Sequence, residues 1–253
     1  MSNVRYEVNG NIAEIYLDRH PVNALHEVML NELLHALHKA AVDIDIRAVI
    51  IASAIPGRFC AGLDLVTLQS TGPEQLHDLL EKLYIKMFDA HIALGKPSIA
   101  AVGGAVRGGG MTVAVGCDMI VAGLSATFGY PEIDKGLLPA IHYAHLPRII
   151  GRHRAFDLLF TGRTFGIDEA LELGLINRAV PDTDILEEAR KLASTFASKP
   201  ALAVRRGRAA FMSAIDGDYR RTVASAVEHF CNTAATEEAR ELIGRFGSKA
   251  SRS

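Results

Sequence analysis

Hydrophobic and polar residues alternate at the start of the chain in the pattern of β-strands. Residues 4–18, VRYEVNGNIAEIYLD, alternate on both sides of Asn9-Gly10, a dipeptide that strongly favours a two-residue hairpin turn. Residues 24–43 instead repeat apolar side chains at intervals of three and four, which is typical of an amphipathic helix. The apolar run 48–54, AVIIASA, is typical of a buried strand. The chain is therefore predicted to begin with a β-hairpin, a helix and a strand.

Helices and strands continue to alternate through the middle of the chain. The periodicity predicts a long helix over 72–94, a short strand over 96–102, and two further strands close together after that. This order is typical of an α/β protein. Helical patterns dominate the later part, so we predict a mixed α/β core over residues 1–190 and a helical region over residues 191–253.

Composition and charge narrow the classes of partner. A chain of 253 residues with 49% hydrophobic and 22% charged residues can bury a full core. Its net charge of −2 gives no general attraction to nucleic acid or to anionic membranes. The short basic cluster at 205–208 lies in a helical pattern and is expected to be a solvated helix face. We therefore expect neither a nucleic-acid partner nor a membrane partner.

Cysteine and histidine spacing gives no sign of a metal site. Cys60, Cys117 and Cys231 are far apart and include no C-x-x-C pair, so neither a disulfide framework nor a zinc site is indicated. His35 and His38 have no acidic pattern beside them, and a solvated helix face explains them better than a metal. With no apolar export segment or spanning run in the sequence, we expect a reducing, cytoplasmic location.

Two glycine-bearing turns are the first candidates for chemistry. The stretch 56–65, PGRFCAGLDL, follows one predicted strand, and Gly108, Gly109 and Gly110 follow the strand at 96–102. Glycines let a ligand approach the backbone closely, and a helix that starts near residue 110 would present unpaired N–H groups. Two such donors that converge on one carbonyl oxygen would form an oxyanion hole. Either stretch taken alone is explained more simply as a tight turn.

Several motifs in a fixed order make the two turns more specific. The chain contains RHPVNAL at 19–25, GGGMTVAVGCD at 108–118, ATFGYPEIDKGLLP at 126–139 and FTGRTFGIDEALELGLINRAVP at 160–181. Together they resemble the enoyl-CoA hydratase/isomerase family, the crotonases, from residue 4 to about 245. The resemblance implies a spiral of β-β-α turns, a helical C-terminal trimerisation region, and a homotrimer or homohexamer. It also implies a coenzyme A thioester as the substrate, with no separate cofactor.

The resemblance also assigns roles to individual residues. It carries the two oxyanion-hole N–H groups to Ala61 and Gly109, and it makes Glu132, in the Pro-Glu dipeptide, the acid–base residue. Thr112 stands where the family's hydratases have a second glutamate, and a threonine does not ionise near neutral pH. The residues expected to contact coenzyme A are Ala24, Arg58, Ala61, Gly62, Leu63 and Asp64.

A single glutamate suits a proton shuttle between two carbons, so a double-bond isomerase is slightly favoured over a hydratase. Two other interpretations stay open. The chain could bind acyl-CoA thioesters with weak or no catalysis, or it could be an atypical lyase or hydrolase of the same family. Ala140 occupies the position of the aspartate found in dienoyl-type isomerases, so that subtype is not expected.

The segment 137–151, LLPAIHYAHLPRIIG, departs from the glycine-rich stretch usual in the family. It carries His142 and His145, whose spacing of three places both on one side of a helix. They are either contacts in the acyl pocket or partly buried structural histidines. Arg58 could meet a coenzyme A phosphate or be an ordinary surface arginine. We find no physical reason for Arg107 before the triple glycine.

Overall fold

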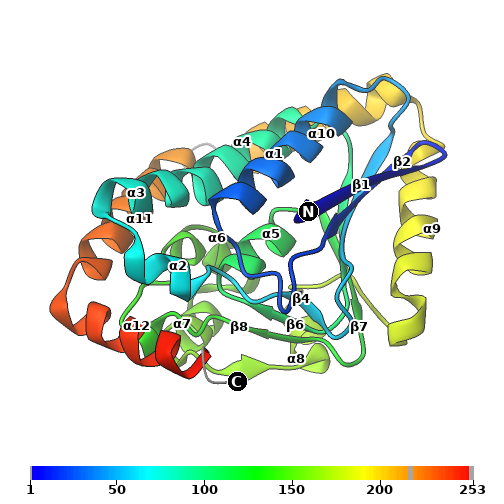
Figure 1. Cartoon of the computed structure of the whole chain (residues 1–253). Helices are drawn as coiled ribbons and strands as arrows, with labels where there is room; N and C mark the ends of the chain where they lie inside the picture. Colours follow the sequence, from blue (N-terminus) through cyan, green and yellow to red (C-terminus); the bar gives the residue numbers. More distant parts are fainter. Residues whose placement is uncertain (1, 216–218, 251–253) are drawn as a thin grey trace.

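A computed structural model describes residues 2–215 and 219–250. Within these residues the strands form two sheets (Figure 1). The larger sheet has the order β1 (Val4–Asn9), β2 (Ile12–Leu17), β3 (Ala48–Ser53), β5 (Ser98–Val102), β7 (Met119–Gly123) and β10 (Arg178–Val180). The smaller sheet has the order β4 (Arg58–Cys60), β6 (Ala105–Arg107), β8 (Thr127–Gly129) and β9 (Thr164–Phe165).

The strands are laid down as a repeating spiral. The pairs β3 and β4, β5 and β6, and β7 and β8 each give one strand to the larger sheet and one to the smaller, and helices follow each pair. Neighbouring strands from successive turns of the spiral run parallel. The predicted hairpin is confirmed, because β1 and β2 are antiparallel and pair Asn9 with Ile12 across the turn. The predicted α/β spiral of β-β-α turns is confirmed as well.

Helices surround the two sheets. A π-helical turn, η1 (Glu81–Lys86), interrupts the helix predicted over 72–94 and divides it into α3 (Pro73–Leu80) and α4 (Met87–Ala93). The helical elements are α1 (Glu27–Val42), α2 (Leu65–Ser70), α3 (Pro73–Leu80), η1 (Glu81–Lys86), α4 (Met87–Ala93), α5 (Gly109–Val115), η2 (Ile133–Lys135), α6 (Ala140–Ile150), α7 (Arg152–Thr161), α8 (Ile167–Glu172), η3 (Asp182–Asp184), α9 (Ile185–Ala197), α10 (Ala201–Ile215), α11 (Tyr219–Ala234) and α12 (Glu237–Ala250).

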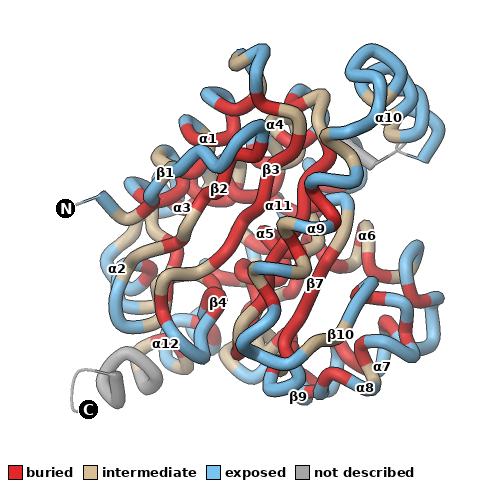
Figure 2. Tube along the Cα trace, turned by 90° about the vertical axis from the view of Figure 1, so that its right-hand side faces the viewer, coloured by how far each residue is buried: buried red, intermediate tan, exposed pale blue. Residues whose placement is uncertain are grey.

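The inner strands β3, β5 and β7 of the larger sheet are buried on both faces, as their apolar residues predict. Along β3, Ile50 packs with Ala189 and Leu192 of α9, which stands alone on the outer face of the sheet (Figure 1). Val49 and Ile51 belong to the main core on the other face. Buried positions run along β3 and β7 in Figure 2. The sheet is thus a rigid support for the turns that follow its strands.

The C-terminal helices differ in how they pack. Helix α11 packs against α6 and α12 against α2, whereas α10 has no buried residue. The predicted boundary at residue 190 falls inside α9, and the division into 1–190 and 191–253 stays a prediction. Residues 216–218 and 251–253 of that second region lie outside the described residues. In the described part of the chain, no helix is both long and apolar enough to cross a membrane.

Candidate active site

The loop after β4 lies directly against the start of α5. Leu25 N–H donates to Gly62 O at 2.7 Å, and Asp64 N–H donates to Leu25 O at 2.8 Å, so the loop is pinned to the segment before α1. Gly62 has a φ of +88°, and a Cβ there would lie 2.8 Å from Arg107 O and 3.1 Å from Gly109 N. Only glycine fits this left-handed backbone and this close approach.

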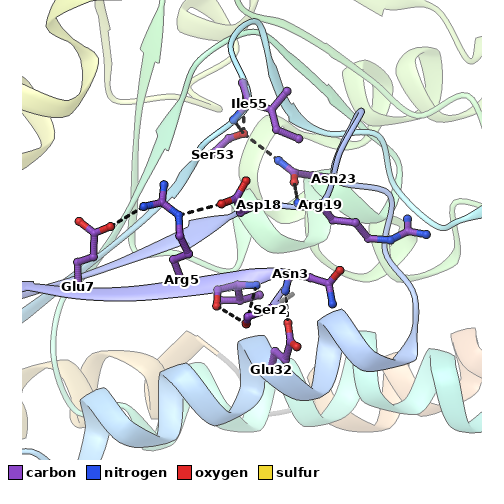
Figure 3. A network of polar contacts seen from close by, with 11 residues as sticks. Ser2, Asn3, Arg5, Glu7, Asp18, Arg19, Asn23, Glu32, Ser53 and Ile55 are labelled. Carbon is purple, nitrogen blue, oxygen red and sulfur yellow. Dashed lines mark hydrogen bonds and ion pairs between the residues drawn. The ribbon is translucent and has the colours of Figure 1, made fainter.

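Asn23 holds this arrangement together from the buried side. Its Oδ1 accepts from Arg19 N–H at 2.7 Å, and its Nδ2 donates to Ser53 Oγ at 2.8 Å and to Phe59 O at 2.9 Å. Figure 3 shows the Asn23 side chain between Arg19 and Ser53. The side chain is fully buried and its backbone is left-handed, with a φ of 53°. Sequence reasoning missed Asn23 because two of its three partners come from β3 and β4.

The structure corrects the assignment of one oxyanion-hole donor. Ala61 N–H donates to Val22 O at 3.0 Å, so it is not available to a substrate, and the prediction for Ala61 is wrong. The left-handed Gly62 interrupts this pairing, and the next N–H, that of Leu63, has no hydrogen-bond acceptor among the described residues. Leu63 N lies 3.6 Å from the position of a Cβ on Gly109. Leu63, predicted only as a coenzyme A contact, therefore supplies the free N–H.

Gly109 offers the second free N–H group. It is the first residue of α5, and the first N–H groups of a helix have no acceptor within the helix. The positive end of the helix dipole points the same way. The N–H groups of Leu63 and Gly109 thus form a pair of donors from two different turns of the spiral.

The Glu132 carboxylate lies beside this pair. A Cβ on Gly108, whose φ is +49°, would be 2.6 Å from Glu132 Oε1. Glu132 Oε2 is buried and has no hydrogen-bond partner among the described residues. Burial raises the pKa of Glu132 from 4.5 to about 7, against smaller opposing effects of a hydrogen bond from its own backbone N–H and of the charge on Lys135. Glu132 is therefore poised to take up or release a proton near neutral pH.

These groups line one small cavity of about 50 Å³. Its walls come from the loop after β4, the start of α5, the turn around Glu132, and Phe230 of α11. Glu132 is the only carboxylate among the described residues that line it. The predicted site residues Ala61, Gly62, Leu63, Gly109 and Glu132 are brought together there.

The remaining predicted coenzyme A contacts do not line this cavity. Asp64 caps α2 through the N–H groups of Val66 and Thr67, and it pairs with Arg19 at 2.6 Å. Ala24 O accepts from the same arginine at 2.7 Å. Arg58 is exposed, and its guanidinium donates to Gly57 O in its own loop at 3.0 Å. Asp64 shapes the loop, while coenzyme A binding by Ala24, Arg58 and Asp64 stays a prediction.

Thr112 lines a second and larger cavity of about 510 Å³. It lies one turn after Gly109 on α5, so the helix leads from the small cavity to the large one. The Thr112 side chain is buried, and its Oγ1 has no partner among the described residues. Side chains of η1, α4, α6 and α10 form the other walls, most of them apolar.

His142 and His145 connect the two cavities. His142 Nε2 lies 3.3 Å from Gly108 O, and its Nδ1 lies 3.0 Å from His145 Nε2. Burial lowers the pKa of His142 far below its usual value and that of His145 to about 4, so both rings are neutral. A carbonyl oxygen can only accept, so His142 Nε2 carries the proton and His142 Nδ1 accepts from His145. His142 thus contacts the backbone at the start of α5, and His145 also lines the larger cavity. A role for either histidine in the acyl pocket stays a prediction.

The geometry matches a known family of proteins. A family model described as enoyl-CoA hydratase/isomerase matches residues 7–251. The chain belongs to this family. It is 36% identical over 223 residues to "Probable enoyl-CoA hydratase 2, mitochondrial" of Arabidopsis thaliana, covering 87% of this chain and 72% of that one. It is 32% identical to "Crotonyl-CoA hydratase" of Syntrophomonas wolfei, covering 96% of this chain and 94% of that one.

Solved structures of the family share the whole architecture. An enoyl-CoA hydratase/isomerase from Xanthobacter autotrophicus Py2 superposes with a TM-score of 0.89 at 28% identity, over 98% of this chain and 95% of the other. An enoyl-CoA hydratase from Bacillus anthracis gives a TM-score of 0.81 at 30% identity, over 98% and 96%. The predicted family and fold are confirmed, and the chain is an acyl-CoA enzyme of the enoyl-CoA hydratase family.

Proposed function

We propose that the enzyme isomerises a double bond in an enoyl-CoA thioester, with Glu132 as its single acid–base residue. The observation that carries the proposal is the set of groups around the small cavity. Two free backbone N–H groups, of Leu63 and Gly109, lie beside one carboxylate whose Oε2 is unpartnered. The position one turn into α5 holds Thr112, which supplies no second carboxylate.

The two N–H groups bind the thioester oxygen and stabilise negative charge that develops on it. This raises the acidity of the neighbouring carbon. Glu132 removes a proton from C2 of a 3-enoyl thioester, and the electron pair spreads into a dienolate whose charge rests on the thioester oxygen. Protonated Glu132 then returns the proton to C4, which leaves the double bond between C2 and C3. One carboxylate completes the cycle, and no water is consumed.

The environment of Glu132 suits this proton transfer. A base that must both take and return a proton works best when its pKa lies near the working pH. Burial of the Glu132 carboxylate has this effect. The hydrogen bond from His142 to Gly108 O supports the reaction as well. Gly108 O and Gly109 N–H belong to the same peptide group, so this bond polarises the N–H that binds the thioester oxygen.

Hydration of a 2-enoyl thioester is the second candidate. It is supported by the names of relatives, which include hydratases of Arabidopsis and Syntrophomonas, and by the unpartnered Thr112 hydroxyl. In this reaction Thr112 holds a water, Glu132 takes its proton, and the hydroxide adds to C3. The two candidates differ in whether Thr112 contributes to the chemistry.

Two variants distinguish these reactions. Glu132→Gln keeps the shape of the side chain and removes the proton acceptor, so turnover should fall by about 10² to 10⁴ while thioester binding survives. Thr112→Val should leave isomerisation within a few-fold of wild type, whereas it should greatly reduce hydration. Isomerisation of a 3-enoyl-CoA and hydration of a 2-enoyl-CoA are measured separately for each variant.

The control for the first variant is Asp134→Asn, which removes an exposed carboxylate two residues away. Near-normal turnover by Glu132→Gln, with any thioester that wild type converts, contradicts the role of Glu132. Turnover of no thioester by wild type, together with normal thioester binding, supports the interpretation that the chain binds acyl-CoA without efficient catalysis.

We also propose that the enzyme assembles as a homotrimer or a hexamer of two trimers. Helix α10 has no buried residue and exposes Leu202, Phe211 and Ile215, which a second chain would cover. A monomer mass in light scattering at micromolar concentration would contradict the assembly. A cytoplasmic location stays a prediction, which fractionation of cells tests.

A further inference from the structure

The larger cavity holds buried polar atoms that nothing in the described protein satisfies. His91 of α4 is 1% exposed, and neither of its ring nitrogens has a hydrogen-bond partner among the described residues. Thr112 is 5% exposed, and its Oγ1 is unpartnered in the same way. Both line the cavity together with Met87, Phe88 and Ile141. Two unsatisfied polar side chains therefore face a largely apolar space, whose lining also includes Asp118, His145 and Arg148.

Such an arrangement costs folding free energy. A buried donor or acceptor without a partner costs about 1 to 3 kcal/mol, and native proteins contain few of them. Met87 and His91 lie one turn apart on α4, where an apolar residue at position 91 would carry no such cost. The presence of a histidine at this position is explained if a ligand supplies the hydrogen-bond partner that its ring nitrogens lack.

The backbone around His91 makes room for its ring. A Cβ on Gly116 would lie 3.2 Å from both Cδ2 and Nε2 of His91, so glycine at this position lets α5 pass against the imidazole. Gly116 itself lines the cavity. The ring is thus held between α4 and α5, close to the wall that also carries Thr112.

The neighbouring charges do not serve as partners for His91. Asp118 already accepts from Ser98 N–H at 2.8 Å, from Ser98 Oγ at 3.0 Å and from Arg208 Nε at 2.9 Å. Burial lowers the pKa of His91 to about 4, and the charges on Asp118 and Arg208 act on it in opposite directions. The imidazole is neutral at physiological pH and offers one donor and one acceptor.

We propose that the larger cavity selects acyl groups that carry an uncharged hydroxyl or keto group, and that His91 recognises this group. A neutral imidazole and a threonine hydroxyl can each donate and accept, which matches a hydroxyl or a keto oxygen. Neither can balance the charge of a buried carboxylate. Arg148, the cationic side chain in the lining, is exposed and donates to Ile215 O at 3.4 Å. The volume of about 510 Å³ lies within the usual range for small-molecule pockets.

This inference rests on the proposed function. An acyl group extends along α5 into the larger cavity when its thioester oxygen is bound by Leu63 and Gly109. Thr112 lies at the entrance from that side, and His91 lies on the opposite helix. His91 touches no reacting atom, so its role is substrate specificity and not catalysis.

The test compares the binding of matched saturated thioesters, which cannot be turned over. The protein is titrated with octanoyl-CoA and, separately, with octanoyl-CoA analogues that carry one hydroxyl or one keto group at a single carbon from C5 to C8. An analogue with a terminal carboxylate tests a charged acyl group. Wild type should bind at least one hydroxy or keto thioester about tenfold or more tightly than octanoyl-CoA, because sites built to hydrogen-bond a group reject analogues that lack it. The carboxylate analogue should bind more weakly than this thioester.

Variants of His91 identify the residue responsible. His91→Leu should lose the preference, through about tenfold weaker binding of the polar thioester and unchanged or tighter binding of octanoyl-CoA. His91→Gln, which retains a donor and an acceptor, should restore part of the preference. His38→Leu replaces an exposed histidine of α1 and should leave both affinities unchanged. Without a ligand, His91→Leu should melt at or above the wild-type temperature, because it removes unsatisfied polar atoms.

Two results overturn the proposal. One is binding of octanoyl-CoA by wild type at least as tight as that of every hydroxy and keto thioester. The other is an equal loss of affinity for polar and apolar thioesters in His91→Leu. If wild type binds no thioester at all, the proposed function fails and the selectivity fails with it, whereas tight binding without selectivity refutes the selectivity alone.

Discussion

Replacement of Glu132 by glutamine should change activity and stability in opposite directions. Glu132 is the carboxylate beside the two free N–H groups, so its loss should remove catalysis. The same carboxylate is buried with an unpartnered oxygen, and burial raises its pKa to about 7. An ionised group in that position opposes folding, so Glu132→Gln should also remove a source of instability at alkaline pH.

The size of the stability effect follows from the two pKa values. The folded protein holds the Glu132 proton more tightly than the unfolded chain does, because the pKa is about 7 instead of 4.5. The contribution of Glu132 to the free energy of unfolding of wild type therefore falls as pH rises from 4.5 to about 7. It is constant below pH 4.5 and above pH 7. At about 1.4 kcal/mol per pH unit, the fall is about 3.5 kcal/mol at most. Glu132→Gln should match wild type near pH 4 and exceed it near pH 8.

The assay is denaturant unfolding of both proteins at several pH values, beside the pH profile of kcat/KM for wild type. The profile should rise to a plateau above about pH 7 and fall about tenfold per pH unit below it, since the ionised carboxylate is the base. Asp134→Asn serves as the exposed control. An identical pH dependence of unfolding in wild type and Glu132→Gln would show that the carboxylate is hydrated, and would refute the reasoning.

Three further variants test the architecture of the site. Gly62→Ala places a Cβ 2.8 Å from a backbone oxygen at a φ of +88°, so kcat/KM should fall about a hundredfold or more. The control is Gly166→Ala, whose Cβ would meet no atom within 4 Å and should leave kcat/KM nearly unchanged. Asn23→Ala removes three hydrogen bonds of a buried side chain and should lower the free energy of unfolding by about 2 to 4 kcal/mol, measured by denaturant titration. A change below about 0.5 kcal/mol would contradict its role. His142→Phe should lower kcat by up to about tenfold with little change in KM, because it removes the bond to the oxyanion-hole peptide. A purely KM effect of that variant in steady-state kinetics would exclude the positioning role.

The local pattern of the sequence determined the order and type of the elements that carry the site. The alternation around Asn9-Gly10 predicts the hairpin, and the apolar runs predict β3 and β5, because side-chain periodicity reflects which face of an element is buried. The order of the glycine-rich and Pro-Glu motifs determined the family. Glu132 could be nominated on that basis, although its burial and its unpartnered oxygen could not.

Only the tertiary structure decided which backbone N–H group is free. Ala61 and Leu63 both lie in the same glycine-bearing turn, and no local pattern distinguishes them. The choice depends on Val22, which lies almost forty residues earlier in the chain and accepts from Ala61. A hydrogen bond is directional and needs both partners within about 3 Å, so its assignment requires the packing of distant segments.

His91 and Asn23 show the same limit. In the sequence, His91 is one position of a predicted amphipathic helix. Its ring nitrogens lack partners because the ring lies against Gly116 and faces the cavity between α4, α5 and α10. Asn23 belongs to the entry motif in the sequence, and two of its three hydrogen bonds depend on β3 and β4. Sequence periodicity determined which side chains face the core. Which polar groups are shielded from water, and which partners they meet, depended on contacts between segments far apart in the chain.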